Sequence, residues 1–224
     1  WLKPSLLQQT DPSAALLPYW LGAWAIQLAP PGVPLDVAAH LPFMGLLALS
    51  LAATWYAVYA LARSPAAQPV AFAFGGEARP ADYARAVAEG GLLALLACWG
   101  LARLSHEATP ALAQLSFATL LFFALANLSR KRLIGLCSAC FAILGMALSG
   151  APALAMVLGV GGALIMALDA EKPSSLRVRR IDVAWIILIC LACAAVVSAL
   201  GLWRWRVNFS QLLEFKSMMR LMLW

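Results

Sequence analysis

Six long apolar blocks dominate the hydrophobic pattern of the chain. A helix needs about 20 residues to cross a hydrocarbon core of about 30 Å, and each block is close to that length. None of them alternates polar and apolar residues as a membrane barrel strand does. We therefore expect transmembrane helices at Leu41 to Ala62, Ala86 to Leu104, Ala111 to Leu128, Arg132 to Ser149, Ala151 to Leu168 and Val183 to Trp203.

A shorter apolar stretch, from Ala14 to Ala29, is rich in Trp and Tyr. Pro18 lies near its start, and Pro30 and Pro31 end it, because proline cannot continue a helix. Aromatic residues gather where the hydrocarbon meets the lipid headgroups. We expect this stretch to be an interfacial helix on the membrane surface.

The composition excludes an ordinary soluble domain. Of 224 residues, 63% are hydrophobic and 12% are charged, whereas a soluble domain is roughly half apolar and a quarter charged. The predicted fold class is all-α and integral to the membrane, a polytopic helical bundle of about six transmembrane helices plus an N-terminal interfacial helix. We expect a periplasmic loop and the interfacial helix in residues 1–40, the transmembrane region in 41–203, and a periplasmic segment leading towards a further span in 204–224.

Positive charge is concentrated in alternate connections. The connections after the first, third and fifth predicted spans carry ten of the sixteen Lys and Arg residues, which indicates that they are cytoplasmic. The net charge of +6 therefore reflects membrane orientation, and no nucleic-acid partner is expected. The predicted location is a membrane, which the chain crosses several times. The ten residues are Arg63, Arg79, Arg85, Arg130, Lys131, Arg132, Lys172, Arg177, Arg179 and Arg180.

The outward connection LSHEATPALAQL, residues 104–115, contains His106 and Glu107. Two interpretations stand: a catalytic site at the membrane surface, or a polar turn before Pro110, which suits the first turn of a helix. Adjacent helical residues diverge by about 100 degrees, so these two side chains could share a metal ion only in a turn.

Other candidate groups also lie near the predicted outer face. His40 is either an interfacial polar group or a ligand, and Trp203 to Arg206, WRWR, is either an anchor or a holder of a lipid phosphate. The Cys137–Cys140 and Cys190–Cys193 pairs could supply four metal-binding thiolates, but thiolate charge in lipid is costly, which favours packing. Gly159 to Gly162, GVGG, predicts a close approach between helices.

The order of these segments resembles bacterial membrane glycosyltransferases of the GT-C class, in particular the aminoarabinose transferase and protein O-mannosyltransferase-like group. WLKPSLLQQTDPSAALLPYWLGAWAIQLAP is similar to the end of that family's first periplasmic loop, with its Trp-Leu-x-Pro start and Tyr-Trp-Leu helix. DVAAHLPF resembles its Ala-Ala-Arg-Leu-Pro entry to the next span. LSHEATPALAQLSF stands in the place of its Thr-Asp phrase, and RKRLIGLCSACFAILGMALSGAP resembles its Leu-x-Lys-Gly-Pro phrase.

The resemblance implies transfer of a sugar from a polyprenyl-phosphate carrier to a periplasmic or lipid acceptor. It implies catalysis by Glu107 and His106, with a divalent metal at Glu107 as one option and no other cofactor expected. The partners that the resemblance implies are membrane lipid and the sugar donor, and the location that it implies is the bacterial inner membrane. The residues expected to bind the lipid phosphate are Lys3, Arg103, Arg204, Arg206, His40 and Tyr19.

Three positions depart from the family pattern. Ala14 stands in place of a phosphate-binding lysine, Pro110 in place of the carboxylate, and Ser149 in place of the lysine of Lys-Gly-Pro. The family's acidic motif would precede Trp1, so we expect a piece of a longer protein, completed by the rest of its chain or by partner membrane subunits. The alternatives are a noncatalytic membrane subunit or scaffold derived from that fold, and a transporter-like protein.

Overall fold

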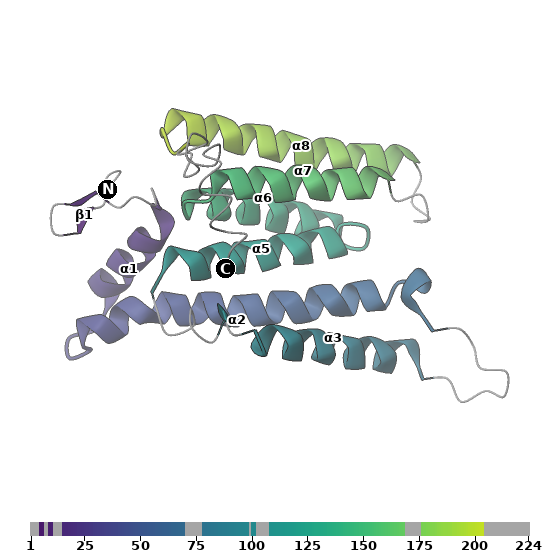
Figure 1. The fold of residues 1–224 in the computed structure, drawn as a ribbon, viewed down its shortest axis with the longest axis horizontal. Helices are drawn as coiled ribbons and strands as arrows, with labels where there is room; N and C mark the ends of the chain where they lie inside the picture. Colours follow the sequence, from purple (N-terminus) through teal and green to yellow (C-terminus); the bar gives the residue numbers. More distant parts are fainter. Residues whose placement is uncertain are drawn as a thin grey trace, which may run out of the picture.

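A bundle of helices accounts for most of the chain (Figure 1). The computed structural model describes residues 5–6, 9–10, 15–69, 78–98, 100–101, 108–168 and 176–203. The helices are α1 (Leu17–Leu28), α2 (Leu35–Ala62), η1 (Pro65–Ala67), α3 (Pro80–Leu96), α5 (Pro110–Asn127), α6 (Arg132–Leu148), α7 (Pro152–Leu168) and α8 (Leu176–Ala199). Before them, β1 (Ser5–Leu6) and β2 (Gln9–Thr10) pair as a short antiparallel hairpin.

Proline sets several helix boundaries. Pro80, Pro110 and Pro152 are the first residues of α3, α5 and α7, where the missing N–H would have no intrahelical acceptor. Pro30 follows the end of α1, and Gly32 takes a φ of 101°, which turns the chain towards α2. The expected short helix near the N-terminus is therefore confirmed, while its place at a membrane surface stays a prediction.

Each of the six predicted apolar blocks contributes a helix. Three segments are long and apolar enough to cross a membrane: Leu35–Ala62, Pro110–Asn127 and Val178–Ala199. α6 and α7 are also apolar but have 17 residues each. The described chain thus has helices suited to a membrane, and the count of six spans stays a prediction.

α3 differs most from its predicted span. It begins at Pro80, six residues before the expected Ala86, and it ends at Leu96. The added residues include Asp82 and Arg85, which are exposed. The apolar pattern missed residues 80–85 because they do not form an apolar run, whereas a helix satisfies its own backbone groups whether its side chains face lipid or water.

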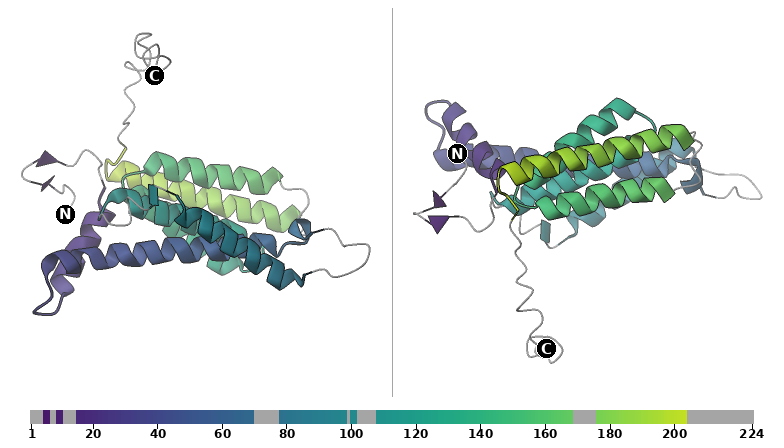
Figure 2. Two further views of the ribbon diagram at one scale, coloured as in Figure 1. Left: turned by 60° about the horizontal axis from the view of Figure 1, so that its bottom comes forward. Right: turned by 90° about the horizontal axis from the view of Figure 1, so that it is seen from above.

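α5 lies in the middle of the bundle. It packs against α2 on one side and α6 on the other, while α3 covers α2, and α8 covers α6 and α7 (Figure 2). Phe117 and Leu121 of α5 are buried against Ile143 and Met146 of α6, and Ile186 brings α8 into the same core. The 128–131 and 149–151 turns are short, so α5, α6 and α7 run antiparallel to their neighbours in sequence.

Two serines join α2 to α5 inside the bundle. Ser116 Oγ lies 2.8 Å from Ser50 Oγ and 2.8 Å from the carbonyl oxygen of Leu46, across the interface. Both serines are fully buried. Small hydroxyl side chains let helices approach closely and also bond across the interface, which is how helices commonly associate in lipid.

Glycines allow the other close contacts. A Cβ atom on Gly145 of α6 would lie 2.6 Å from Cζ of Phe117, and one on Gly159 of α7 would lie 2.6 Å from Sγ of Cys190 on α8. A Cβ on Gly162 would lie 2.5 Å from Cδ1 of Leu125 on α5. The close helix approach predicted for GVGG is therefore confirmed at two of its glycines.

The two ends of the bundle differ in charge. Every Lys and Arg whose side chain the structure describes lies at the end where α2, α5 and α7 finish and α3, α6 and α8 begin, which we call the basic end (Figure 1). We call the opposite end, where α1 lies, the α1 end. The predicted alternation of connections between two sides is confirmed as alternation between these ends, and which end is cytoplasmic stays a prediction. The basic end holds Arg63, Arg79, Arg85, Arg130, Lys131, Arg132, Arg179 and Arg180.

We expect Gly145→Ala to destabilise the bundle by about 1 to 3 kcal/mol, because the new methyl group would overlap the buried Phe117 ring. The control is Gly161→Ala, since a Cβ there meets no atom within 4 Å. Thermal unfolding of the full-length protein in detergent compares the two variants. Equal midpoints for both variants would contradict the close α5–α6 contact.

Candidate functional site

Most of the predicted site residues lie outside the described residues. These are Glu107, His106, Lys3, Arg103, Arg204 and Arg206, and their proposed roles stay predictions. Ala14 is outside as well. The structure does describe His40, Tyr19, Pro110 and Ser149, and it describes the helix ends that lie at the α1 end.

Pro110 and Ser149 have structural roles at the α1 end. Pro110 begins α5, directly after Thr109, which takes an extended conformation as the N-cap. Ser149 is fully buried, and its hydroxyl donates to the carbonyl oxygen of Gly145 at 2.7 Å, which caps the end of α6. Neither residue can supply the charge that the resembled family carries at its position. Any catalytic charge at this end must come from other residues.

Hydrogen bonds hold several segments together at the α1 end. The amide of Leu16, just before α1, donates to the carbonyl oxygen of Leu148 at the end of α6 over 2.8 Å. Gln114 Nε2 of α5 donates to the carbonyl oxygen of Ser149 over 2.7 Å. α1 also packs against α2. The segments before α1, at the start of α2, in α5 and at the end of α6 are thus fixed relative to one another at the α1 end.

His40 lies inside α2, because the helix begins at Leu35 rather than at the predicted Leu41. Its ring is exposed, and Nδ1 lies 2.6 Å from the carbonyl oxygen of Asp36, so that nitrogen donates the bond. Tyr19 is half-buried on α1. Both residues therefore lie at the end of the bundle where the sequence predicts a lipid-phosphate site.

Two of the four helical cysteines are packed inside the bundle. Cys190 and Cys193 of α8 are buried, while Cys137 and Cys140 of α6 are exposed, and none forms a disulfide. Cys193 Sγ lies 3.8 Å from the carbonyl oxygen of Ile143. Within the described part of the chain, no three His, Cys, Asp or Glu side chains are placed to hold a metal ion.

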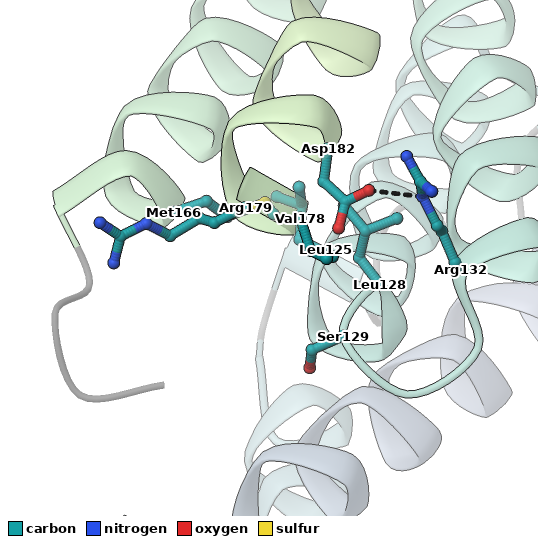
Figure 3. Close-up of a pocket in the computed structure, with 8 residues that line it drawn as sticks. All are labelled: Leu125, Leu128, Ser129, Arg132, Met166, Val178, Arg179 and Asp182. Atoms are coloured by element: carbon teal, nitrogen blue, oxygen red, sulfur yellow. Dashed lines mark ion pairs between the residues drawn. The ribbon is translucent and has the colours of Figure 1, made fainter. Parts of the chain in front are cut away.

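The structure adds one ion pair that the sequence interpretation missed. Asp182 of α8 is 4% exposed, and its Oδ1 lies 2.6 Å from Nε of Arg132 at the start of α6 (Figure 3). The N–H direction is not aligned for a hydrogen bond, so the contact is mainly electrostatic. A small cavity of about 90 Å³ lies beside the pair, bordered by Ser129 and Arg179. The sequence could have indicated this pair. The helices that became α6 and α8 were both predicted to start on the same side of the membrane, which places Arg132 and Asp182 at similar depths.

Comparisons with known proteins assign no family to the chain: no protein-family model matches it, and neither a curated protein nor a solved structure does. The functional interpretation therefore depends on the residues themselves and on the family resemblance of their order.

We expect Arg132→Gln to destabilise the bundle by about 3 kcal/mol, because it leaves the buried Asp182 carboxylate without its counter-charge. Arg85→Gln is the matched control, since the Arg85–Asp82 pair is 3.7 Å apart and mostly exposed. Exposed pairs contribute about 1 kcal/mol or less. Chemical unfolding in detergent measures both losses. If the two variants lose equally little, the Arg132–Asp182 pair does not stabilise the α6–α8 contact.

Proposed function

We propose that the chain is the membrane-embedded part of a glycosyltransferase that takes a sugar from a polyprenyl-phosphate carrier at the outer face of a bacterial inner membrane. One observation carries the proposal. The phrases that resemble the GT-C family are far apart in sequence, yet they meet at the α1 end. α1 holds the Tyr-Trp-Leu phrase, α2 begins at Leu35 directly before DVAAHLPF, α5 begins at Pro110, and α6 leads into the SGAP turn.

The contacts at the α1 end support a common site. The Leu16–Leu148 bond joins α1 to α6, the Gln114–Ser149 bond joins α5 to the SGAP turn, and α1 packs on α2. Reacting groups must be held in a fixed geometry, and rigid helix ends provide that better than free loops do. The four segments that resemble the family, namely α1, the start of α2, the start of α5 and the end of α6, are therefore held as one unit. Residues 102–107 directly precede the described start of the α5 segment in sequence.

α1 suits the handling of a lipid-linked donor. With 12 residues it is about 18 Å long, too short to cross the hydrocarbon core. Trp20 and Trp24 lie against each other with ring centroids 6.2 Å apart, and Trp24 and Leu28 are exposed. Exposed Trp and Leu favour the boundary between lipid and water. A polyprenyl carrier presents its phosphate at that same boundary.

In the proposed reaction, Glu107 accepts a proton from the acceptor hydroxyl as the hydroxyl oxygen attacks the anomeric carbon of the sugar. The bond from that carbon to the carrier phosphate breaks, and the polyprenyl phosphate leaves as an anion. Positive side chains stabilise the departing phosphate. Lys3, Arg103, Arg204 and Arg206 are the residues proposed for this role, with His40 and Tyr19 nearby on the outer face.

A noncatalytic membrane subunit is the second candidate. The structural roles of Pro110 and Ser149 favour it, because a helix start and a buried cap occupy two positions where the resembled family carries charge. Such a subunit would keep the helix packing of the fold and bind partner subunits without transferring sugar.

We expect Glu107→Gln and His106→Ala to lower sugar transfer at least 100-fold, as loss of a general acid or base does. The assay incubates the full-length protein with labelled polyprenyl-phosphate sugars and measures consumption of the donor. The matched control is Glu89→Gln, since Glu89 is exposed on α3 and should not affect transfer.

Membrane insertion is measured for all three variants and should not change. Unchanged transfer in both Glu107→Gln and His106→Ala would rule out this turn as the catalytic site. If the wild-type protein consumes no donor, the subunit hypothesis is favoured over the enzyme.

A further inference from the structure

A second polar region, distinct from the α1 end, lies at the basic end of the bundle. A cavity of about 480 Å³ opens there between α2, α5 and the start of α6. Three cations border it: Arg63 at the end of α2, and Arg130 and Lys131 in the turn between α5 and α6. Tyr56 and Tyr59 of α2 also line it. The cavity therefore combines positive charge with aromatic surface.

The three cations have no counter-charge within the described residues. Arg63, Arg130 and Lys131 are exposed, and no carboxylate of the described chain lies within 4 Å of them. Two other cations at the basic end do have a carboxylate partner: Arg85 with Asp82, and Arg132 with Asp182. Uncompensated positive charge around a concave surface attracts an anion.

Arg63 is held in place by stacking along α2. The rings of Trp55 and Tyr59 stack with centroids 5.2 Å apart and an interplanar angle of 8°. The guanidinium carbon of Arg63 lies 5.7 Å from the centroid of the Tyr59 ring, which is within the range of a cation–π contact. Because the three residues are spaced four apart, they share one face of the helix. A preorganised arginine loses less conformational entropy when it binds an anion.

The start of α6 also favours an anion in the cavity. Lys131 is the N-cap of α6 and makes no side-chain capping hydrogen bond. The first amides of a helix lack intrahelical acceptors, and the helix dipole is positive at this end. Ile134, in the first turn, lines the cavity. An anion in the cavity would therefore lie beside Arg130, Lys131 and a helix N-terminus together.

The cavity lies where the membrane boundary is expected. α2 and α5 are both long and apolar enough to cross a membrane, and the cavity lies at their shared end. Its apolar lining includes Phe123 and Ile134, and Ile134 and Tyr56 are about half exposed. A soluble phosphate would not use this apolar surface, whereas an acyl chain would. The lining thus matches a molecule with an anionic head and an apolar tail.

We propose that this cavity binds the phosphate headgroup of an anionic phospholipid from the leaflet at the basic end. Arg63, Arg130 and Lys131 hold the phosphodiester, and the acyl chains lie along Tyr56, Phe123 and Ile134. Basic pockets between transmembrane helices commonly hold anionic headgroups. The site lies at the other end of the bundle from the proposed sugar transfer, so it does not depend on that function.

The test compares two variants of the full-length protein that lose equal charge at the same end. The cavity variant carries Arg63→Gln, Arg130→Gln and Lys131→Gln, and the control carries Arg79→Gln, Arg85→Gln and Arg180→Gln, which do not line the cavity. Binding of short-chain phosphatidylglycerol and phosphatidylcholine is titrated in neutral detergent. Each cation near an anionic headgroup contributes about fivefold in affinity. We expect the cavity variant to lose at least tenfold more phosphatidylglycerol affinity than the control, and phosphatidylcholine to bind at least tenfold more weakly to the wild type.

A charge-preserving variant distinguishes a loss of lipid binding from a failure of the glutamine variant to fold. Arg63→Lys together with Arg130→Lys keeps the membrane orientation signal and the positive charge, so it should lose only the smaller share of affinity that the stacking of Arg63 on Tyr59 contributes. Glycerol 3-phosphate serves as the soluble headgroup. Equal losses in the cavity and control variants would overturn the proposal in favour of a diffuse surface charge. A loss in the lysine variant as large as in the glutamine variant would overturn it too, as would competition by glycerol 3-phosphate at the concentration of the lipid.

Discussion

The close contacts that α5 makes with its neighbours hold this bundle together. Helices in lipid gain little from burying apolar side chains against one another, since lipid tails are equally apolar. Association then depends on how near the backbones can come and on the polar groups between them. Ser116 meets Ser50 and the Leu46 carbonyl on the α2 side, and Phe117 meets the bare backbone of Gly145 on the α6 side. Because α5 is the central helix, loosening either contact would separate α2 and α3 from α6, α7 and α8.

This packing confines charge to the ends of the bundle. The helices meet through Ser, Gly, Ala and Cys, and the one charged side chain buried among the described residues, Asp182, is near the basic end and paired with Arg132. The α1 end is held by neutral hydrogen bonds, such as that from Gln114 to Ser149, whereas the basic end combines ion pairs with free cations. The same scaffold therefore offers two chemically different surfaces, one proposed for a sugar carrier and one for an anionic headgroup.

The helices could be predicted well from the sequence, and the candidate site only in part. Apolar length and proline positions located the helices, because in lipid the backbone must satisfy its own hydrogen bonds. His40 was placed outside the first span, since Asp36 and His40 interrupt the apolar run, but α2 extends through both residues. The Asp182–Arg132 pair joins residues fifty positions apart, so no local pattern reveals it. The catalytic roles of Glu107 and His106 remain predictions from the order of the segments.

By itself, the sequence determined that the chain forms apolar helices with basic connections on one side, because helix length and charge placement are local properties. Only the tertiary structure decided which residues meet. It assigned Ser149 to a buried helix cap, and it brought Arg63 beside Arg130 and Lys131, which are distant from it in sequence. The physical reason is that contacts between helices depend on small residues at particular rotational positions. The average hydrophobicity of each helix, which the sequence pattern measures, says little about those positions.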